Sequence, residues 1–219
     1  MRRPGAAVKV VQAGPGLGAL EHVTAATRDR MPSGLVSFGF AGGLAPQLPP
    51  GTILLPRHIR RGTGPIAAVD PEWHGRVLEA LLETGNCSTD DLLAVDAIIH
   101  RPAEKAGLHA QSGAGAVDLE SGVLAAIAAG LGVPFLVLRV ILDGAGDALP
   151  RSAARMLTPA GGTRLLPTLL TMVRSPAAFA RLLRRHRRAA RGLQHALAAA
   201  WPEILSPPSR PAARLNGTA

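Results

Sequence analysis

Two carboxylates, Glu120 and Asp143, stand just after two short, mainly apolar segments of the chain, of which the first includes Asp118. Glu120 follows residues 115–119, and Asp143 follows residues 134–142, where Arg139 is the single charged side chain. Short apolar runs of this kind are typical of strands buried inside a sheet. Ligands of α/β proteins bind at the carboxyl ends of strands, so we expect both carboxylates to open onto one cleft.

The elements that must position these carboxylates alternate between strands and helices. The sequence predicts strands at 7–13, 35–40, 51–55, 92–99, 115–119 and 134–142, and helices at 19–30, 71–84, 103–111 and 121–131. This alternation predicts an α/β fold with a central mixed, mostly parallel sheet flanked by helices in three layers. Residues 151–201 look helical with breaks at prolines, so we expect a helical C-terminal extension that packs on a main domain, residues 1–150. Residues 202–219 are rich in Pro, Ser and Ala and predict a disordered tail.

The composition narrows the class of protein. The chain of 219 residues carries 24 Lys and Arg against 15 acidic residues, a net charge of +9, and much of this excess lies in residues 181–191. Such an excess suggests an anionic partner. A single cysteine, Cys87, and the lack of a Cys/His cluster with zinc spacing favour a reducing compartment and no metal. No apolar run reaches the roughly 18 to 20 residues that span a bilayer, and no signal peptide is evident, so we expect a cytoplasmic protein.

Three motifs in order carry a resemblance to a known family. Residues 39–44 read Gly-Phe-Ala-Gly-Gly-Leu, residues 96–99 read Asp-Ala-Ile-Ile, and residues 116–121 read Ala-Val-Asp-Leu-Glu-Ser, followed by Arg-Val-Ile-Leu-Asp at 139–143. Over residues 34–147 the chain resembles the nucleoside phosphorylase superfamily, which includes the methylthioadenosine and adenosylhomocysteine nucleosidases. The corresponding patterns of that family are Gly-Ser-Ala-Gly-Gly, acid-Met-Glu and Arg-x-Ile-Ser-Asp.

The resemblance implies an enzyme that cleaves the bond between a purine and a ribose, with residues 1–150 as its catalytic domain. It implies no cofactor, with phosphate as a co-substrate in phosphorylases. Glu120 would bind the ribose hydroxyls, and Asp143 would bind or protonate the purine at N7. Leu119 would pack against the ribose and Ile98 against the base. The full set of substrate-binding residues that it implies is Ala41, Gly42, Ile98, Ile99 and Leu119.

The chemistry of ribosyl transfer suits two carboxylates. Breaking the bond builds oxocarbenium character on the sugar, and the base leaves badly unless it is protonated. A positioned general acid contributes about 10²- to 10⁴-fold. For Asp143 to be that acid near neutral pH, its pKa must be raised, which the apolar neighbours Ile141 and Leu142 favour. The structural alternative is that Glu120 caps the following helix and that Asp143 forms a turn.

The glycine-rich segment 14–18 is the candidate phosphate site, through backbone amides at Gly14 and Gly16. Gly14-x-Gly16-x-x-Ala19 also fits a relaxed dinucleotide fingerprint, but no acidic residue follows a second strand at the expected distance. No acidic residue precedes Glu21. A glutamate that activates water, which nucleosidases carry on an upstream loop, would therefore have to lie before Met1, or the nucleophile site differs.

Two further positions depart from the family pattern. Phe40 replaces a Ser or Thr whose hydroxyl commonly helps to hold phosphate, and Leu142 replaces the Ser before Asp143. The first departure removes a phosphate contact. The second would loosen the orientation of the aspartate.

The segment Arg181–Arg191 predicts a helix with leucines on one face and arginines on the other. It is either a terminal helix with a solvated basic face or an attachment to an anionic membrane surface. Nucleic acid is disfavoured, because aromatic residues make up 3% of the chain and no base-reading motif is present. Residues 174–191 resemble the C-terminus of hopanoid-associated phosphorylases, which remove adenine from adenosylhopane.

That branch implies a lipid-linked purine nucleoside as substrate, a role in hopanoid biosynthesis and a peripheral location on the inner face of the cytoplasmic membrane. The sequence leaves the oligomeric state open, with a homo-oligomer as one option. The hypothesis from a different class is a non-catalytic module of the same superfamily, which binds a nucleoside or a membrane without turnover.

Overall fold

A long parallel pair of strands, β1 (Leu35–Gly43) and β8 (Phe135–Asp143), forms the centre of the fold. The computed structural model of the protein describes residues 8–11, 17–28, 30–62, 64–149 and 176–208. The other strands are β2 (Ile53–Leu54), β3 (His58–Arg61), β4 (Gly64–Ala68), β5 (Cys87–Ser88), β6 (Leu92–Ala94) and β7 (Ala116–Asp118). The helices are α1 (Leu17–Thr27), α2 (Pro71–Leu82), α3 (Pro102–Ser112), α4 (Ser121–Leu131) and α7 (Pro176–Ile204).

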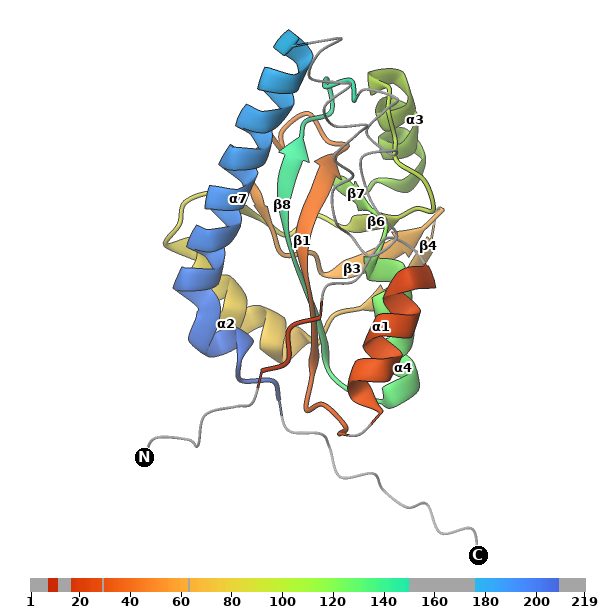
Figure 1. The fold of residues 1–219 in the computed structure, drawn as a ribbon, viewed down its shortest axis with the longest axis vertical. Helices are drawn as coiled ribbons and strands as arrows, with labels where there is room; N and C mark the ends of the chain where they lie inside the picture. Colours follow the sequence, from red (N-terminus) through yellow and green to blue (C-terminus); the bar gives the residue numbers. More distant parts are fainter. Residues whose placement is uncertain (1–7, 12–16, 29, 63, 150–175, 209–219) are drawn as a thin grey trace, which may run out of the picture.

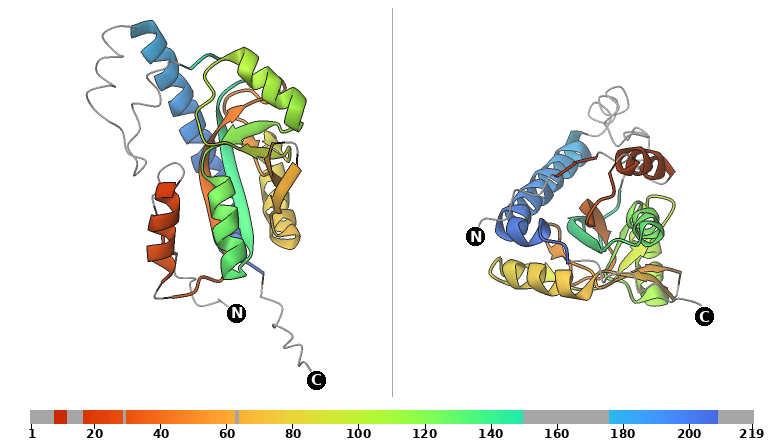
Figure 2. Two further views of the ribbon diagram at one scale, coloured as in Figure 1. Left: turned by 90° about the vertical axis from the view of Figure 1, so that its right-hand side faces the viewer. Right: turned by 90° about the horizontal axis from the view of Figure 1, so that it is seen from below.

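The strands form one mixed sheet in the order β4-β3-β6-β7-β1-β8-β2-β5. Among the described residues, β1–β8, β2–β5, β3–β6 and β6–β7 pair in parallel, and β1–β7, β2–β8 and β3–β4 pair antiparallel. Helices α1 and α4 lie together on one side of the sheet, and α2 and α7 lie on the other (Figures 1 and 2). The predicted three-layer α/β fold is confirmed.

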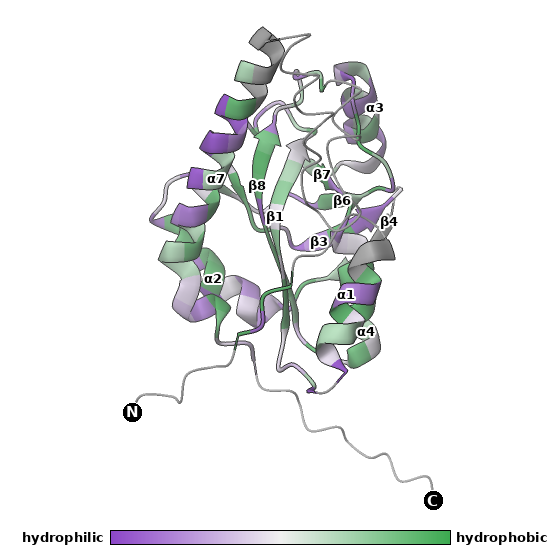
Figure 3. Cartoon of the chain, viewed as in Figure 1, coloured by the Kyte–Doolittle hydropathy of each residue, from purple (hydrophilic) through white to green (hydrophobic). Residues whose placement is uncertain are grey.

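Strand β8 is apolar except for Arg139 and the terminal Asp143, because both of its faces are covered. Alternate side chains of a strand point to opposite faces of a sheet, so each face of β8 contributes to a separate apolar cluster. Phe135, Val137 and Ile141 pack in the cluster beneath α1 and α4, whereas Leu136, Leu138 and Val140 pack in the cluster beneath α2 and α7. Figure 3 shows β8 as hydrophobic, whereas α7 carries hydrophilic stretches along its length.

The C-terminal helix α7 packs against α2 and β8. Trp73 of α2 is buried, and its Nε1 donates a hydrogen bond to the carbonyl oxygen of Glu203 at 2.8 Å. Helix α7 continues to Ile204, beyond the point at Pro202 where we expected a tail to begin, because Ile204 is itself part of the apolar cluster under α7. The predicted domain boundary at residue 150 and the tail from residue 209 lie outside the described residues.

Two predicted strands differ from the structure, and one hairpin was not predicted. Residues 8–11 of the predicted strand 7–13 have no regular structure, and Val8 and Val10 are exposed to solvent. The β3–β4 hairpin escaped prediction because β3 reads His-Ile-Arg-Arg, which lacks an apolar alternation. Strand β6 ends at Ala94 rather than at residue 99, since the chain turns outward at the exposed Asp96. No helix in the described ranges is long and apolar enough to cross a bilayer.

Gly115 holds the loop after β1 against the start of β7, which positions Glu120. Its carbonyl oxygen accepts hydrogen bonds from the amides of Leu44 and Ala45 at 2.8 and 3.0 Å, and a Cβ atom there would lie 2.5 Å from the Cβ of Asp90. We expect Gly115→Ala to lower the free energy of unfolding by about 1 to 3 kcal/mol in urea denaturation, because the site is already full.

The matched control is Gly75→Ala on α2, where a Cβ atom meets nothing within 4 Å. That change should raise stability by about 0.5 to 1 kcal/mol, because Ala favours a helix interior. Equal stability of the Gly115 variant and the wild type would refute the packing argument.

Candidate active site

One residue of β1, Gly42, lies between the two predicted carboxylate segments. It pairs with Val117 of β7 on one side and with Asp143 of β8 on the other. An irregularity after Ala41 in the β1–β8 register places Asp143, rather than Leu142, opposite Gly42. A Cβ atom on Gly42 would lie 3.5 Å from Oδ2 of Asp143, so the carboxyl group lies against the Gly42 backbone.

The strands that carry the two carboxylates run in opposite directions. Strand β8 is parallel to β1, whereas β7 is antiparallel to it, so their carboxyl ends do not meet at one edge of the sheet. Asp143 lies at the level of Gly42, and Glu120 lies beside Arg139, which pairs with Gly39.

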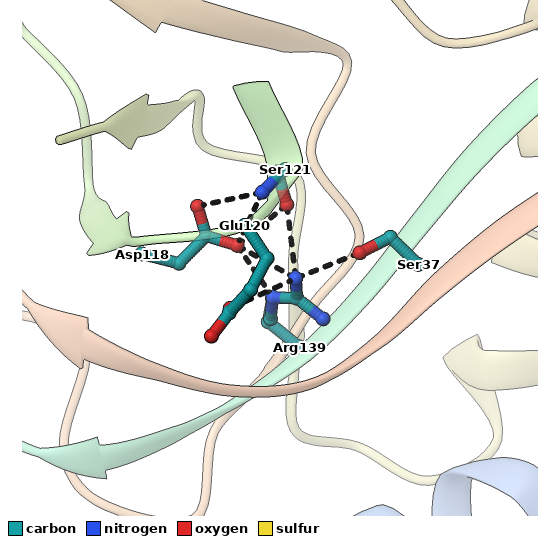
Figure 4. A network of polar contacts seen from close by, with 5 residues as sticks. All are labelled: Ser37, Asp118, Glu120, Ser121 and Arg139. Atoms are coloured by element: carbon teal, nitrogen blue, oxygen red, sulfur yellow. Dashed lines mark hydrogen bonds and ion pairs between the residues drawn. The ribbon is translucent and has the colours of Figure 1, made fainter. Parts of the chain in front are cut away.

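Arg139 is the buried centre of a polar network (Figure 4). Its Nε donates a hydrogen bond to Oδ2 of Asp118 at 2.8 Å, and its Nη2 lies 2.7 Å from the same oxygen. Nη2 also donates to the hydroxyl oxygens of Ser37 and Ser121, at 2.7 and 3.0 Å. Oε2 of Glu120 lies 3.6 Å from Nη2. Arg139 therefore joins β8 to β1, β7 and the start of α4.

Asp118 takes the capping role at α4 that the sequence offered to Glu120. The hydroxyl of Ser121 donates to Oδ2 of Asp118 at 2.5 Å, and the Ser121 amide lies 3.3 Å from both carboxylate oxygens. Glu120 stands at the N-cap position but makes no capping hydrogen bond with its side chain. Its side chain is 28% exposed, against 1% for Asp118, and Figure 4 shows one of its oxygens pointing away from the network.

The environment of Glu120 favours its protonated form relative to a glutamate in water. Burial raises the pKa of Glu120, the neighbouring charge of Asp118 adds to this, and Arg139 opposes it. A carboxylate that is partly desolvated and held on one side by a guanidinium is suited to bind hydroxyl groups.

Asp143 is 3% exposed and binds a lysine that the sequence analysis did not select. Nζ of Lys105, on α3, donates hydrogen bonds to Oδ2 of Asp143 and to the carbonyl oxygen of Gly144, the second at 2.7 Å. Burial raises the pKa of Asp143, and the charge of Lys105 opposes this. The alternative prediction, that the side chain of Asp143 forms a turn, is wrong. Asp147 forms the turn instead, because its Oδ2 accepts a hydrogen bond from the Gly144 amide at 2.9 Å. Arg185 of α7 in turn donates to Asp147.

The other predicted binding residues differ in how near they lie to these carboxylates. Gly42 lies against Asp143, and Ala41 is buried in the cluster beneath α1 and α4. Ile98, Ile99 and Leu119 are half-buried, and Ile99 packs against the small apolar cluster next to α3. Gly14 and Gly16, the predicted phosphate contacts, lie outside the described residues. In the part of the chain that the structure describes, no group of three His, Cys, Asp or Glu side chains could hold a metal ion.

Sequence reasoning missed Lys105 and Ser37 for different reasons. A lysine on a short helix among Ala, Glu and Gly residues reads as a solvated side chain. One signal could have found Lys105, since 22 of the 24 basic residues are arginines and Lys105 is one of only two lysines. Ser37 lies inside an apolar strand and 102 positions from its partner Arg139, so no local pattern announces that contact.

The Arg139 network makes a prediction about stability. Arg139→Met leaves the carboxylate of Asp118 buried without its cation, so we expect a loss of about 3 to 5 kcal/mol in the free energy of unfolding. Arg139→Lys should lose less stability than Arg139→Met, because lysine keeps the positive charge beside Asp118. It should still be less stable than the wild type, because lysine lacks the several N–H donors of the guanidinium group. Arg61→Met is the matched control, since Arg61 is 52% exposed and pairs with the exposed Asp96; we expect less than about 1 kcal/mol. Equal losses for the two Met variants would contradict the network.

Comparisons with known proteins agree with this architecture. Methylthioadenosine/adenosylhomocysteine nucleosidase from Neisseria meningitidis aligns with a TM-score of 0.63 at 14% identity, covering 87% of this chain and 78% of that one. Futalosine hydrolase of Helicobacter pylori aligns with a TM-score of 0.59 at 16% identity, covering 85% and 77%. The corresponding nucleosidase of Campylobacter jejuni aligns with a TM-score of 0.56 at 19% identity, covering 63% and 68%.

At such identities these structures establish a shared fold. No curated protein sequence matches the chain. The sequence profile of the Phosphorylase superfamily, however, matches residues 4–162, which are most of the chain and include both carboxylate segments. The chain therefore belongs to the Phosphorylase superfamily.

Proposed function

We propose that this protein cleaves the N-glycosidic bond of a purine nucleoside, with Asp143 protonating the base and Glu120 binding the ribose hydroxyls. The main support for the proposal is that Asp143 and Glu120 lie in different environments. Asp143 is a buried carboxyl group with a raised pKa at the end of β8, and Glu120 is a more exposed carboxylate beside the guanidinium of Arg139.

The reaction follows from these two positions. The proton on Asp143 moves to N7 of the purine, the bond between C1′ and N9 breaks, and its electron pair stays on the base, which leaves neutral. Positive charge then develops on the ribose, where the nearby carboxylate of Glu120 stabilises it. A nucleophile, water or inorganic phosphate, completes the substitution at C1′.

Amide variants of the two carboxylates test the assignment. Adenine release from 5′-methylthioadenosine, followed by chromatography, should fall about 10²- to 10⁴-fold in kcat for Asp143→Asn, because the amide cannot donate the proton. For Glu120→Gln we expect a loss of about 10- to 100-fold in kcat/KM, the size of one hydrogen bond to a charged group. Glu79→Gln, an exposed glutamate on α2, should leave the rate unchanged. Undiminished release in both site variants would refute the proposal.

Binding without any release by the wild type would instead favour the non-catalytic module. Calorimetry with 5′-methylthioadenosine would show this as a binding heat with no adenine formed. The sugar product shows whether phosphate or water is the nucleophile. Phosphorolysis needs added phosphate and yields a ribose 1-phosphate, whereas hydrolysis yields a free sugar.

We further propose that the natural substrate is a lipid-linked adenine nucleoside such as adenosylhopane, presented at an anionic membrane. The resemblance of residues 174–191 to hopanoid-associated phosphorylases supports this. Helix α7 also lies next to the site, since Arg185 binds Asp147 and the ring of His186 lies 5.2 Å from that of Phe40. Exposed arginines continue along α7 at Arg184, Arg187, Arg188 and Arg191.

Vesicles containing adenosylhopane test this finer proposal. Adenine release should be faster from vesicles with anionic lipids than from neutral ones, and added salt should abolish the difference, because surface charge is screened within a Debye length. Equal rates from both kinds of vesicle, or a preference for soluble 5′-methylthioadenosine over adenosylhopane, would refute the lipid assignment and leave nucleoside cleavage standing.

A further inference from the structure

Lys105 binds the carboxyl group of Asp143 out of reach of solvent, and a general acid does not by itself require such a partner. Both side chains are nearly inaccessible, at 1% and 4% exposure. Burying an ammonium group beside an ionisable carboxyl group carries a large desolvation cost, and apolar residues of similar size often stabilise a fold as well or better. A buried pair is therefore weak evidence for stability. Its position at the proposed acid points instead to the reaction.

Lys105 is held so that its ammonium group has a defined place. It lies in the first turn of α3, where the carboxylate of Glu104 accepts a hydrogen bond from the Arg101 amide at 3.3 Å. Its Nζ then binds both Oδ2 of Asp143 and the carbonyl oxygen of Gly144. Two acceptors from consecutive residues fix the cation relative to the end of β8.

The carboxyl group of Asp143 is consequently fixed by Lys105 and by the backbone of Gly42, 3.5 Å from where a Cβ atom would stand. Leu142 has no hydroxyl to help, and it packs in the apolar cluster under α7. Among the described residues that contact this carboxyl group, Lys105 is thus the one that combines a charge with a hydrogen-bond donor.

We propose that Lys105 is the positioning residue of the acid site, which orients the carboxyl group of Asp143 and stabilises the carboxylate left behind when the proton moves to the base. This inference rests on the proposed function. One proton passes from Asp143 to N7, the electron pair of the glycosidic bond stays on the purine, and the new negative charge on Asp143 faces the ammonium group of Lys105. Lys105 itself neither gains nor loses a proton.

The charges around Asp143 determine what removal of Lys105 should do. Lys105 faces it from α3, Asp147 from the loop after β8, and Arg185 from α7. Burial and Asp147 raise the pKa of Asp143, whereas Lys105 and Arg185 lower it. Without the cation of Lys105 the pKa rises further. Asp143 then stays protonated to higher pH but becomes a weaker acid, so activity should extend to higher pH with a lower maximum.

The experiment compares the pH dependence of kcat for adenine release from 5′-methylthioadenosine in the full chain. In Lys105→Met we expect the alkaline limb to move up by about 1 to 3 pH units. The plateau should fall about 10- to 100-fold, part of the contribution of a general acid. Lys105→Arg keeps the charge and should keep the limb of the wild type. Lys9→Met changes the other lysine, which is exposed, and should alter neither quantity. If Lys105→Met lowers the maximal kcat but leaves the alkaline limb of the pH profile where it is in the wild type, the proposal is wrong.

A titration of the ligand-free protein separates this inference from the proposed function. The ¹³C resonance of the Asp143 carboxyl group should show a higher midpoint in Lys105→Met than in the wild type. Adenine release with an unmoved midpoint would refute the role of Lys105 alone. A moved midpoint in a protein that releases no adenine would refute the proposed function, and with it any catalytic role for the pair. If Lys105→Met does not fold, Lys105→Gln removes the charge but keeps a donor.

Discussion

The guanidinium of Arg139 is the interaction on which the arrangement of the site depends. It is buried in the middle of β8 and reaches Asp118, Ser37 and Ser121, so it ties the central strand pair to β7 and to the start of α4. Each bond is strengthened by the low dielectric of the interior, and each would leave a desolvated partner if it were broken. Asp118 binds both Arg139 and Ser121, so Asp118, rather than Glu120, provides the side-chain oxygen at the start of α4. Glu120 makes no capping hydrogen bond and lies at the edge of the Arg139 network.

Gly39 shows how closely the network is packed against β1. It has a φ of +155°, and a Cβ atom there would lie 3.3 Å from Nη1 of Arg139. A glycine permits both the backbone conformation and the approach of the guanidinium. The site is thus built on β1 from two glycines, with Gly39 beside Arg139 and Gly42 beside Asp143. The two carboxylates, Glu120 and Asp143, are each held by one cation, but Asp143 is much the more buried of the pair. Such unlike surroundings assign different tasks to chemically similar groups.

The sequence predicted what local patterns encode and missed what long-range contacts decide. Helix α4 and strand β8 were predicted to within a residue at either end, because long, mainly apolar segments with clear boundaries have few alternatives. The superfamily was also recognisable, since its motifs are short and local, and the profile match confirms it. The roles of Glu120 and Asp143, the lipid-linked substrate and the choice of nucleophile remain predictions.

The pairing partners could not be predicted in the same way. The direction of β7 relative to β1 is set by the whole sheet, and nothing in the segment around Val117 reveals it. Lys105 and Asp143 are 38 positions apart, and their contact depends on how α3 packs over the end of β8. The exchange of roles between Asp118 and Glu120 likewise follows from Arg139, whose reach across three strands appears only in the folded chain.

The central claim is that Asp143 delivers a proton to N7 of a bound purine nucleoside, and nitrogen NMR observes that atom directly. A non-cleavable analogue of an adenine nucleoside, labelled with ¹⁵N at N7, should show a strong upfield displacement of the N7 resonance when it binds the wild-type protein, because protonation or a strong hydrogen bond shields this nitrogen. The displacement should be much smaller in Asp143→Asn, because the amide can donate a hydrogen bond but cannot transfer a proton. A bound nucleoside whose N7 resonance matches that of the free ligand in both proteins would contradict the account.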